Sequence, residues 1–149
     1  MTKIAVLIPC EEKSIAKVIA DVKQYLPSAK VYVYDNNSTD KTAEIAKKSG
    51  AVVRFENRQG KGNVVRRMFA DIDADVYVMT DGDETYDLSR CQDLINYLQD
   101  NNLDMVVGAR KEVENDAYRI GHRSGNFILT KLVQIFFNQK LKDMLSGFR

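Results

Sequence analysis

Apolar runs alternate with helical patterns along this chain. Short, almost continuously apolar runs predict buried strands at residues 3–8, 30–34, 51–55, 75–80 and 104–108. Apolar residues at helical spacing predict helices at residues 14–26, 39–49, 60–71 and 88–99, with Ser38 or Thr39 as the cap of the second helix. Strands that are apolar on both faces are typical of parallel sheets. We therefore predict an α/β fold whose mainly parallel sheet is sandwiched by helices.

Polar and charged residues gather directly after four of these strands. The segments are PCEEKS after the first strand, DNNSTDKT after the second, ENRQGKGN after the third and DGDETYD after the fourth. In open α/β sheets, ligands bind outside the carboxyl ends of the strands, where these segments meet. We therefore expect the four segments to build one binding site together.

The DGDETYD segment places Asp81 and Asp83 two residues apart. In a turn or extended segment, both carboxylates can face the same side, which suits a hard divalent cation such as Mg(II) or Mn(II). A solvated acidic turn is the competing interpretation, and the apolar run before the segment makes it less favoured. Asp87 is predicted to cap the helix that begins near Leu88.

Two further segments are candidates for ligand binding. Asp35 stands at the end of the second strand, where a carboxylate can accept hydrogen bonds from a base or a ribose. The RQGKG segment, residues 58–62, combines two glycines with Arg58 and Lys61 just before a helix. Glycine lets a ligand approach the backbone, and a helix N-terminus attracts anions. The segment matches neither the P-loop nor the dinucleotide fingerprint, and a basic surface turn is an equal alternative.

Composition narrows the class of protein. The length of 149 residues suits one domain, and the net charge of +1 provides no overall basic surface, so no nucleic-acid partner is predicted. Cys10 and Cys91 form no CxxC pair, which argues against a disulfide framework or a zinc site and favours a reducing, cytoplasmic setting. No apolar run is long enough to cross a membrane as a helix.

The last part of the sequence gathers cations and apolar residues. Arg119 and Arg123 flank the single histidine, His122, and Arg149 ends the chain. Guanidinium groups bind phosphate in bidentate fashion, so these arginines suit a phosphate ligand. The apolar block at residues 127–137 predicts a core helix. The alternative is a segment against a membrane surface, because its apolar residues cover more than one helical stripe.

Seven segments, in order, resemble those of family 2 inverting glycosyltransferases: IPCEE, VYDNNSTDKT, RQGKGNVVR, MTDGDETYD, VVGAR, YRIGHRSGN and DMLSGFR. The resemblance is to the branch of dolichyl-phosphate mannose synthases and polyprenyl-phosphate glycosyltransferases. It implies the Rossmann-like nucleotide-diphospho-sugar transferase fold and one glycosyltransferase catalytic domain over residues 1–149. Cys10 runs into Glu11 two residues sooner than is usual in the family, and the family continues beyond SGFR. We therefore expect an N-terminal fragment.

The resemblance also assigns roles to individual residues. It implies that the nucleotide-sugar contacts Pro9, Glu11, Glu12, Asp35, Asn37, Arg58, Lys61 and Asp81, with Asp35 at the base. It implies that Asp81 and Asp83 hold Mg(II) or Mn(II) together with the sugar diphosphate. The residues expected to act in catalysis or at the acceptor phosphate are Asp83, Arg119, Arg123, Asp143 and Arg149.

The implied reaction is inverting transfer of a hexose from a donor of the GDP-mannose or UDP-glucose type to a polyprenyl or dolichyl phosphate. A phosphate monoester has a second pKa of about 6, so it is already an anionic nucleophile at neutral pH and needs cations rather than a base. The arginine set suits that acceptor. A saccharide hydroxyl is the alternative acceptor, and Asp143 would then be the base.

Other classes of protein stay open at this point. A sugar nucleotidyltransferase would normally have a glycine-rich loop after the first strand, whereas PCEEKS has no glycine. A nucleotide-sugar-binding module without catalysis would bind the nucleotide but transfer nothing. A receiver-like domain ranks last, because the acids after the first strand lack the usual relation to a lone aspartate and a late lysine. Peripheral contact with the inner face of the membrane and the oligomeric state are left open.

Overall fold

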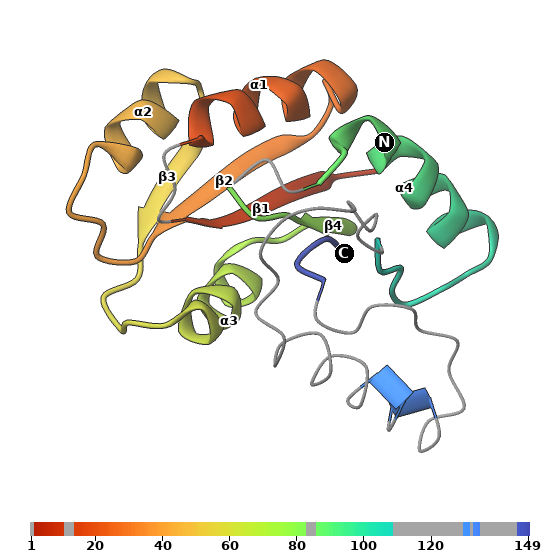
Figure 1. Ribbon diagram of the computed structural model, residues 1–149. Coiled ribbons are helices and arrows are strands. Elements are labelled where there is room, and N and C mark those ends of the chain that lie inside the picture. Colours follow the sequence, from red (N-terminus) through yellow and green to blue (C-terminus); the bar gives the residue numbers. More distant parts are fainter. Residues whose placement is uncertain (1, 11–13, 83–85, 109–129, 132, 135–145) are drawn as a thin grey trace, which may run out of the picture.

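The computed structural model describes residues 2–10, 14–82, 86–108, 130–131, 133–134 and 146–149 (Figure 1). Its strands are β1 (Ile4–Cys10), β2 (Lys30–Asp35), β3 (Val52–Phe55) and β4 (Val76–Met79). Its helices are α1 (Ile15–Tyr25), α2 (Thr42–Lys48), α3 (Lys61–Asp71) and α4 (Cys91–Asp100), with the 3₁₀ turn η1 (Leu88–Arg90) before α4. The strands form one sheet in the order β3-β2-β1-β4, and every neighbouring pair is parallel.

Successive residues of each strand pack on opposite faces of the sheet. Val6 and Ile8 of β1 lie in the core that α1, α2 and α4 cover, whereas Ala5 and Leu7 lie in the core under α3. Figure 1 shows α1 and α2 on one side of the sheet and α3 on the other. Because both faces are covered, the strands must be apolar on both sides. The predicted α/β sandwich is confirmed.

The strand order places a topological switch point beside β1. The chain moves outward from β1 through β2 to β3, then returns to pair β4 with the other edge of β1. Ligands of open α/β sheets bind at such a point, outside the carboxyl ends of the strands. The described residues that follow β2, β3 and β4 therefore converge at the predicted edge of the sheet.

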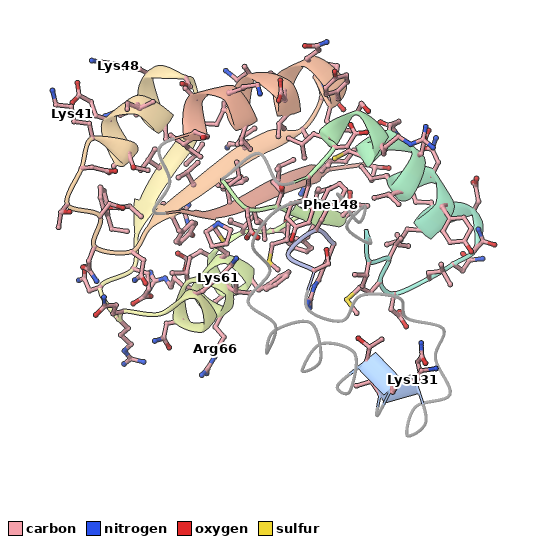
Figure 2. The ribbon with its side chains drawn as sticks, in the orientation of Figure 1. Lys41, Lys48, Lys61, Arg66, Lys131 and Phe148 are labelled. Atoms are coloured by element: carbon pink, nitrogen blue, oxygen red, sulfur yellow. The ribbon has the colours of Figure 1, made fainter. Side chains whose placement is uncertain are left out.

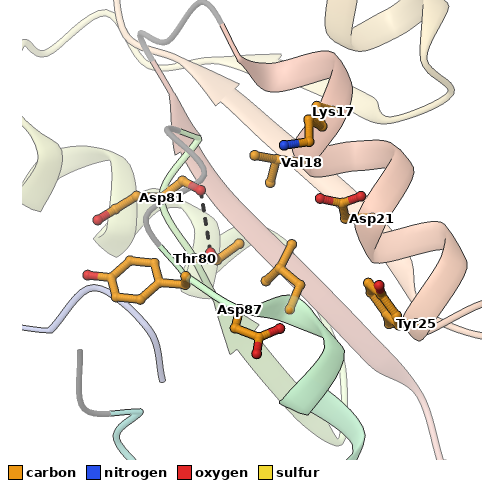
Figure 3. Close-up of a pocket in the computed structure, with 9 residues that line it drawn as sticks. Lys17, Val18, Asp21, Tyr25, Thr80, Asp81 and Asp87 are labelled. Atoms are coloured by element: carbon orange, nitrogen blue, oxygen red, sulfur yellow. Dashed lines mark hydrogen bonds between the residues drawn. The ribbon is translucent and has the colours of Figure 1, made fainter. Parts of the chain in front are cut away.

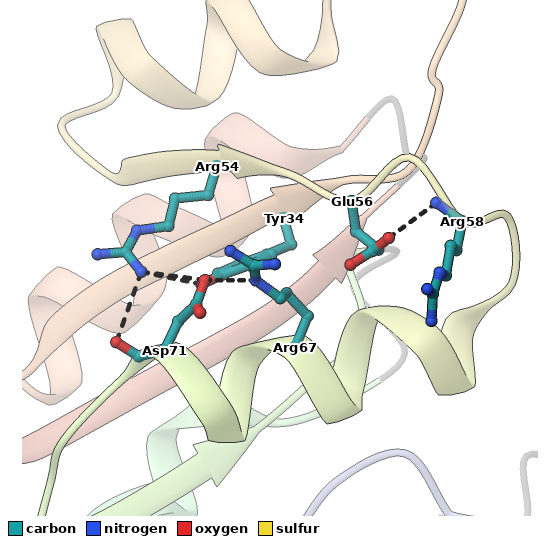
Figure 4. Close-up of polar contacts among 6 residues, drawn as sticks. All are labelled: Tyr34, Arg54, Glu56, Arg58, Arg67 and Asp71. Atoms are coloured by element: carbon teal, nitrogen blue, oxygen red, sulfur yellow. Dashed lines mark hydrogen bonds and ion pairs between the residues drawn. The ribbon is translucent and has the colours of Figure 1, made fainter.

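Helix α3 is anchored to the sheet by a polar cluster at its C-terminal end (Figure 4). The Asp71 carboxylate accepts hydrogen bonds from the Tyr34 hydroxyl at 2.9 Å and from Arg67 Nε at 2.8 Å. Arg54 of β3 lies 3.3 Å from the same carboxylate. The hydrogen bond from Arg67, followed by that from Tyr34, holds the pKa of Asp71 below its usual range. This cluster fixes the axis of α3, and with it the position of its N-terminus.

Two sequence predictions are wrong in detail. The predicted strand at residues 104–108 is not a strand in the structure, where Phe148 and Arg149 take the place beside β4. Gly108 N–H donates to Phe148 O at 2.9 Å instead of joining a longer ladder. At the start of α2, the side chain that accepts the hydrogen bond of Thr42 N–H is Asp40, at 2.9 Å, in place of the predicted Ser38 or Thr39.

The predicted helix at residues 127–137 falls mostly outside the described residues, and residues 130, 131, 133 and 134 within it are helical. In the part of the chain that the structure describes, no helix is both long enough and apolar enough to span a membrane.

Candidate functional site

The structure brings Lys61 and Asp81 together from two separate motifs. Asp81 follows β4, and Lys61 is the first residue of α3. The Lys61 ammonium donates a hydrogen bond to Asp81 Oδ1, and the two side chains are 55% and 23% exposed. A partly exposed ion pair at a strand end contributes little to stability. Both groups therefore remain accessible to a ligand that carries charge of its own.

The N-terminus of α3 lacks a side-chain cap. Its N-cap residue is Gly60, whose φ of 118° is a backbone conformation that other residues rarely adopt. The first N–H groups of a helix have no partner within the helix, and together with the helix dipole they favour anions. At Gly62, in the first turn, a Cβ atom would meet none of the described residues within 4 Å. The backbone is therefore open to approach where Lys61 begins the helix.

Asn36 connects the end of β2 to the loop before α3, and the sequence analysis did not single it out. Its Nδ2 donates to Glu56 O at 2.6 Å and to Arg58 O at 2.9 Å. Its Oδ1 accepts from Gly60 N–H at 2.7 Å. The side chain is buried, and all three hydrogen bonds go to one short loop. Asparagine-rich turns are common after strands, so the pattern DNNSTDKT gave no signal that this residue differed from its neighbours.

The other predicted residues of this edge have distinct environments. Asp35 is buried at the end of β2, and its Oδ1 accepts from Ser38 N–H at 3.2 Å. Asn37 is exposed with a φ of 66°, and its side chain donates to Asn57 O at 3.1 Å. Arg58 is exposed on the loop that Asn36 holds (Figure 4). These residues therefore lie on two adjoining loops at the carboxyl ends of the strands, as the sequence predicted.

Pro9 is also at this edge, but it is a buried residue of β1 paired with Tyr34 of β2. The structure therefore gives Pro9 a packing role within the sheet. A direct contact between Pro9 and a nucleotide stays a prediction.

The last four residues of the chain pack against β4 and the loop that follows it. Met79 and Arg149 exchange two backbone hydrogen bonds, of 2.7 and 3.0 Å. Gly147 N–H donates to the Tyr86 hydroxyl at 2.6 Å, and the Tyr86 ring stacks on Phe148, which Figure 2 shows beside β4. A side chain on Gly147 would collide with the Asp81 carboxylate. The backbone of the predicted site residue Arg149 is thus held beside Met79, the last residue of β4.

A small cleft lies on the other side of this loop, facing α1 (Figure 3). Its volume is about 170 Å³, and its lining includes Lys17 and Asp21 of α1 with Thr80 and Asp87. In Figure 3 the Asp81 side chain points away from α1, so its carboxylate faces the opposite side. Pockets for drug-sized ligands usually measure about 300–1,000 Å³. The cleft alone is therefore too small for a nucleotide-sugar.

Asp81 has the chemistry expected of a ligand to a divalent cation. Its carboxylate already holds the positive charge of Lys61 at the end of a strand. Mg²⁺ and Mn²⁺ are commonly held by one or two carboxylates, with phosphate oxygens completing the shell. Among the described residues, no three acidic, histidine or cysteine side chains form a cluster that could hold a metal unaided. The residues present thus fit a cation that arrives with a phosphate ligand.

Two nearby side chains have structural roles. Asp87 accepts hydrogen bonds from Ser89 N–H at 3.1 Å and from Ser89 Oγ at 2.5 Å, so the predicted helix cap is confirmed, with η1 as the first turn. Cys91 is a free, buried cysteine, and burial raises the pKa of its thiol to about 12. A thiol with so high a pKa is not a nucleophile at neutral pH.

Comparison with known protein families decides the class to which this site belongs. The model described as Glycosyl transferase family 2 matches residues 5–149, which is almost the whole chain. The chain belongs to glycosyl transferase family 2. The prediction of a glycosyltransferase is therefore confirmed, and the edge that carries Lys61 and Asp81 is the candidate donor edge of a family 2 glycosyltransferase.

Two curated proteins illustrate the range of relatives of this family 2 glycosyltransferase. Protein RfbJ of Shigella flexneri is 58% identical over 123 residues, which are 80% of this chain and 95% of RfbJ. The dolichyl-phosphate hexose transferase of Haloferax volcanii is 30% identical over 139 residues, 93% of this chain and 60% of that protein. The chain thus spans nearly all of one relative and less than two thirds of the other.

A solved structure agrees with the fold of this family 2 glycosyltransferase. Glucosyl-3-phosphoglycerate synthase from Mycobacterium tuberculosis, in complex with Mn²⁺, UDP-glucose and phosphoglyceric acid, superposes with a TM-score of 0.68. The superposition covers 99% of this chain and 55% of that chain, at 24% sequence identity. At this identity the likeness shows the fold, and the predicted nucleotide-diphospho-sugar transferase fold is confirmed.

Several predicted site residues of this family 2 glycosyltransferase lie outside the described residues: Glu11, Glu12, Asp83, Arg119, Arg123 and Asp143. Their roles stay predictions. The residues that the sequence analysis missed, Asn36, Tyr86 and Gly147, act through backbone groups far away in the sequence. Local sequence patterns gave no signal for these contacts, because each of them joins residues that are far apart in the sequence.

Proposed function

We propose that this chain is the donor-binding part of an inverting hexosyltransferase that moves a hexose from a nucleotide-diphospho-sugar to a polyprenyl phosphate. The single observation that supports the donor half is the pairing of Lys61, at the uncapped N-terminus of α3, with Asp81 at the end of β4. The Lys61 ammonium suits a diphosphate, and the Asp81 carboxylate suits the cation bound to that diphosphate. The proposed catalytic domain spans residues 1–149.

The donor carries its negative charge on a diphosphate, and the site offers positive charge from two sources. Lys61 supplies an ammonium group, and the first turn of α3 supplies backbone N–H groups with the positive end of the helix dipole. Asp35, at the end of β2, is proposed to accept hydrogen bonds from the base or ribose of the same nucleotide. A divalent cation held by Asp81 and Asp83 would neutralise the charge that develops on the departing nucleoside diphosphate.

The acceptor half rests on the arginines and on one relative. Arg149 lies next to the end of β4, and Arg119 and Arg123 are proposed to join it around an acceptor phosphate. Guanidinium groups match phosphate in bidentate fashion, and an ionised phosphate needs no base. The relative from Haloferax volcanii is named a dolichyl-phosphate hexose transferase. Such an acceptor would bring the protein to a membrane surface.

Gly62→Ala is expected to separate stability from donor binding. Alanine in place of glycine in a helix raises the free energy of unfolding by about 0.5–1 kcal/mol. If the diphosphate approaches the backbone at Gly62, the added methyl group will weaken nucleotide affinity by about tenfold. Thermal unfolding and calorimetry on the same sample measure both effects. A stabilised variant with unchanged nucleotide affinity would show that the diphosphate binds elsewhere.

Asp143→Asn distinguishes the two acceptor classes. With a polyprenyl phosphate as acceptor, the variant is expected to keep most of its transfer rate, because no base is needed. With a saccharide hydroxyl, loss of the base is expected to lower the rate by about 10²–10⁴-fold while donor binding stays intact. Transfer to a short polyprenyl phosphate, with a free sugar as the competing acceptor, is the measurement. Near-total loss of transfer with unchanged donor binding would favour the hydroxyl acceptor.

A further inference from the structure

We propose that Asn36 is the positioning residue that holds the loop at residues 56–60 in the conformation required for donor binding. The inference rests on the proposed function, because it assigns the loop before α3 to the diphosphate of the donor. Asn36 would not touch the donor. It would act through Gly60 and Lys61, which it keeps in place from the neighbouring strand end.

The side chain of Asn36 makes three hydrogen bonds, and all of them go to the backbone of the loop at residues 56–60. The residue is only 4% exposed, and its amide bonds to Glu56 O, Arg58 O and Gly60 N–H at 2.6, 2.9 and 2.7 Å. The three groups lie within five consecutive residues of the loop. The amide therefore fixes the path of the backbone from the end of β3 to the first residue of α3.

Only an amide of this length can make this set of hydrogen bonds. Nδ2 carries two hydrogens, and both meet carbonyl oxygens, while Oδ1 accepts from an N–H group. A carboxylate has the same shape but no hydrogens, so it would face the two carbonyl oxygens with negative charge. Aspartate at position 36 would therefore release the loop even though it fills the same space.

Release of the loop would displace the groups that the donor needs. Gly60 has a φ of 118° and precedes Lys61, whose ammonium reaches Asp81. Asn36 Oδ1 accepts a hydrogen bond from Gly60 N–H, which is the last backbone donor before the helix. If this bond is lost, the start of α3 and the Lys61 side chain can move together, away from Asp81. The effect would fall on donor affinity, while the core formed by β1 and β2 is kept.

The test compares Asn36→Ala and Asn36→Asp with the control Asn101→Ala. Asn101 follows α4 and donates one hydrogen bond to Tyr97 O at 2.9 Å, so the control removes an exposed amide outside the loop at residues 56–60 and outside the candidate donor edge. Calorimetry measures the affinity for GDP and UDP with Mn²⁺, at a temperature where thermal unfolding shows all proteins to be folded. Both Asn36 variants are expected to bind about tenfold more weakly or worse, and the control to stay within about twofold of the wild type.

A second measurement uses the wild type alone and does not depend on the variants being folded. Hydrogen exchange should show a slow amide at Gly60, and bound nucleotide should slow it further. Folded Asn36 variants with wild-type nucleotide affinity, or a Gly60 amide that exchanges as fast as an exposed loop amide, would overturn the inference alone. If the wild type binds neither GDP nor UDP, the proposed function fails, and the inference fails with it.

Discussion

Asp81→Asn is expected to lower Mn²⁺-dependent binding of the nucleotide-sugar, and its transfer, by about a hundredfold or more. The substitution keeps the size of the side chain but removes the negative charge that Lys61 contacts and that a cation would share. Stability should change little, because the ion pair is partly exposed to solvent. Calorimetry with Mn²⁺ measures the binding, and a transfer assay measures the rate.

The matched control is Asp87→Ala, which removes a carboxylate from the same loop. Asp87 caps η1 through Ser89, so its loss is expected to cost about 1 kcal/mol of stability and to leave nucleotide affinity unchanged. The two variants should therefore show opposite patterns of stability and binding. If the Asp81 variant bound the nucleotide as tightly as the wild type, the Asp81 carboxylate would not be part of the donor site.

Lys61→Met is expected to weaken nucleotide affinity by about 10–100-fold, with a shallower dependence on salt concentration. Methionine keeps most of the length and apolar volume of lysine, so the loss reports on the ammonium group. Lys61 begins α3 at the edge where β4 ends, and its ammonium donates a hydrogen bond to the Asp81 carboxylate. A diphosphate bound at this helix N-terminus would compete with that carboxylate for the ammonium.

Arg66→Met is the control for the lysine variant. Arg66 is exposed on the same helix, and Figure 2 shows it on a different side of α3 from Lys61. The two variants lose the same charge from the same element, so a general electrostatic effect would lower nucleotide affinity equally in both. A local role predicts a large effect for Lys61 and less than about a twofold effect for Arg66. Equal effects would show that α3 merely contributes to a diffuse positive field.

The architecture was predictable because each buried strand is apolar along its whole length. Neighbouring residues such as Val6 and Leu7 pack on opposite faces of the sheet, so apolar runs that alternate with helices indicate a parallel sheet covered on both faces. Each of Asp35, Lys61 and Asp81 follows a strand, so the sequence also predicts that the three lie at the carboxyl edge of the sheet. These predictions depend on local patterns and on a general property of parallel sheets.

The remaining features depend on contacts between residues far apart in the sequence. The segment at 104–108 has the composition of a strand, but Phe148 and Arg149 occupy the place beside β4, so it gains no ladder of its own. At the start of α2, Thr42 N–H bonds to Asp40 because the geometry of the loop decides which of several polar side chains is in reach. Asn36 has the same side chain as Asn37, and only its burial against the 56–60 loop distinguishes it.

The family and the geometry answer different questions about the reaction. Membership in glycosyl transferase family 2 gives the class of chemistry, and the Lys61–Asp81 edge gives the place where a donor would bind. The acceptor is a separate proposal, because Arg119, Arg123 and Asp143 lie outside the described residues. Experiments on donor binding can therefore succeed or fail independently of the choice of acceptor.

The most direct test of the donor site is calorimetry of the wild-type chain with GDP and with UDP, each in the presence and absence of Mn²⁺. We expect that one of the two nucleotides binds, that binding requires the cation, and that the Asp81→Asn variant no longer binds it. If neither nucleotide binds with Mn²⁺ present, the edge formed by Lys61 and Asp81 is not a donor site.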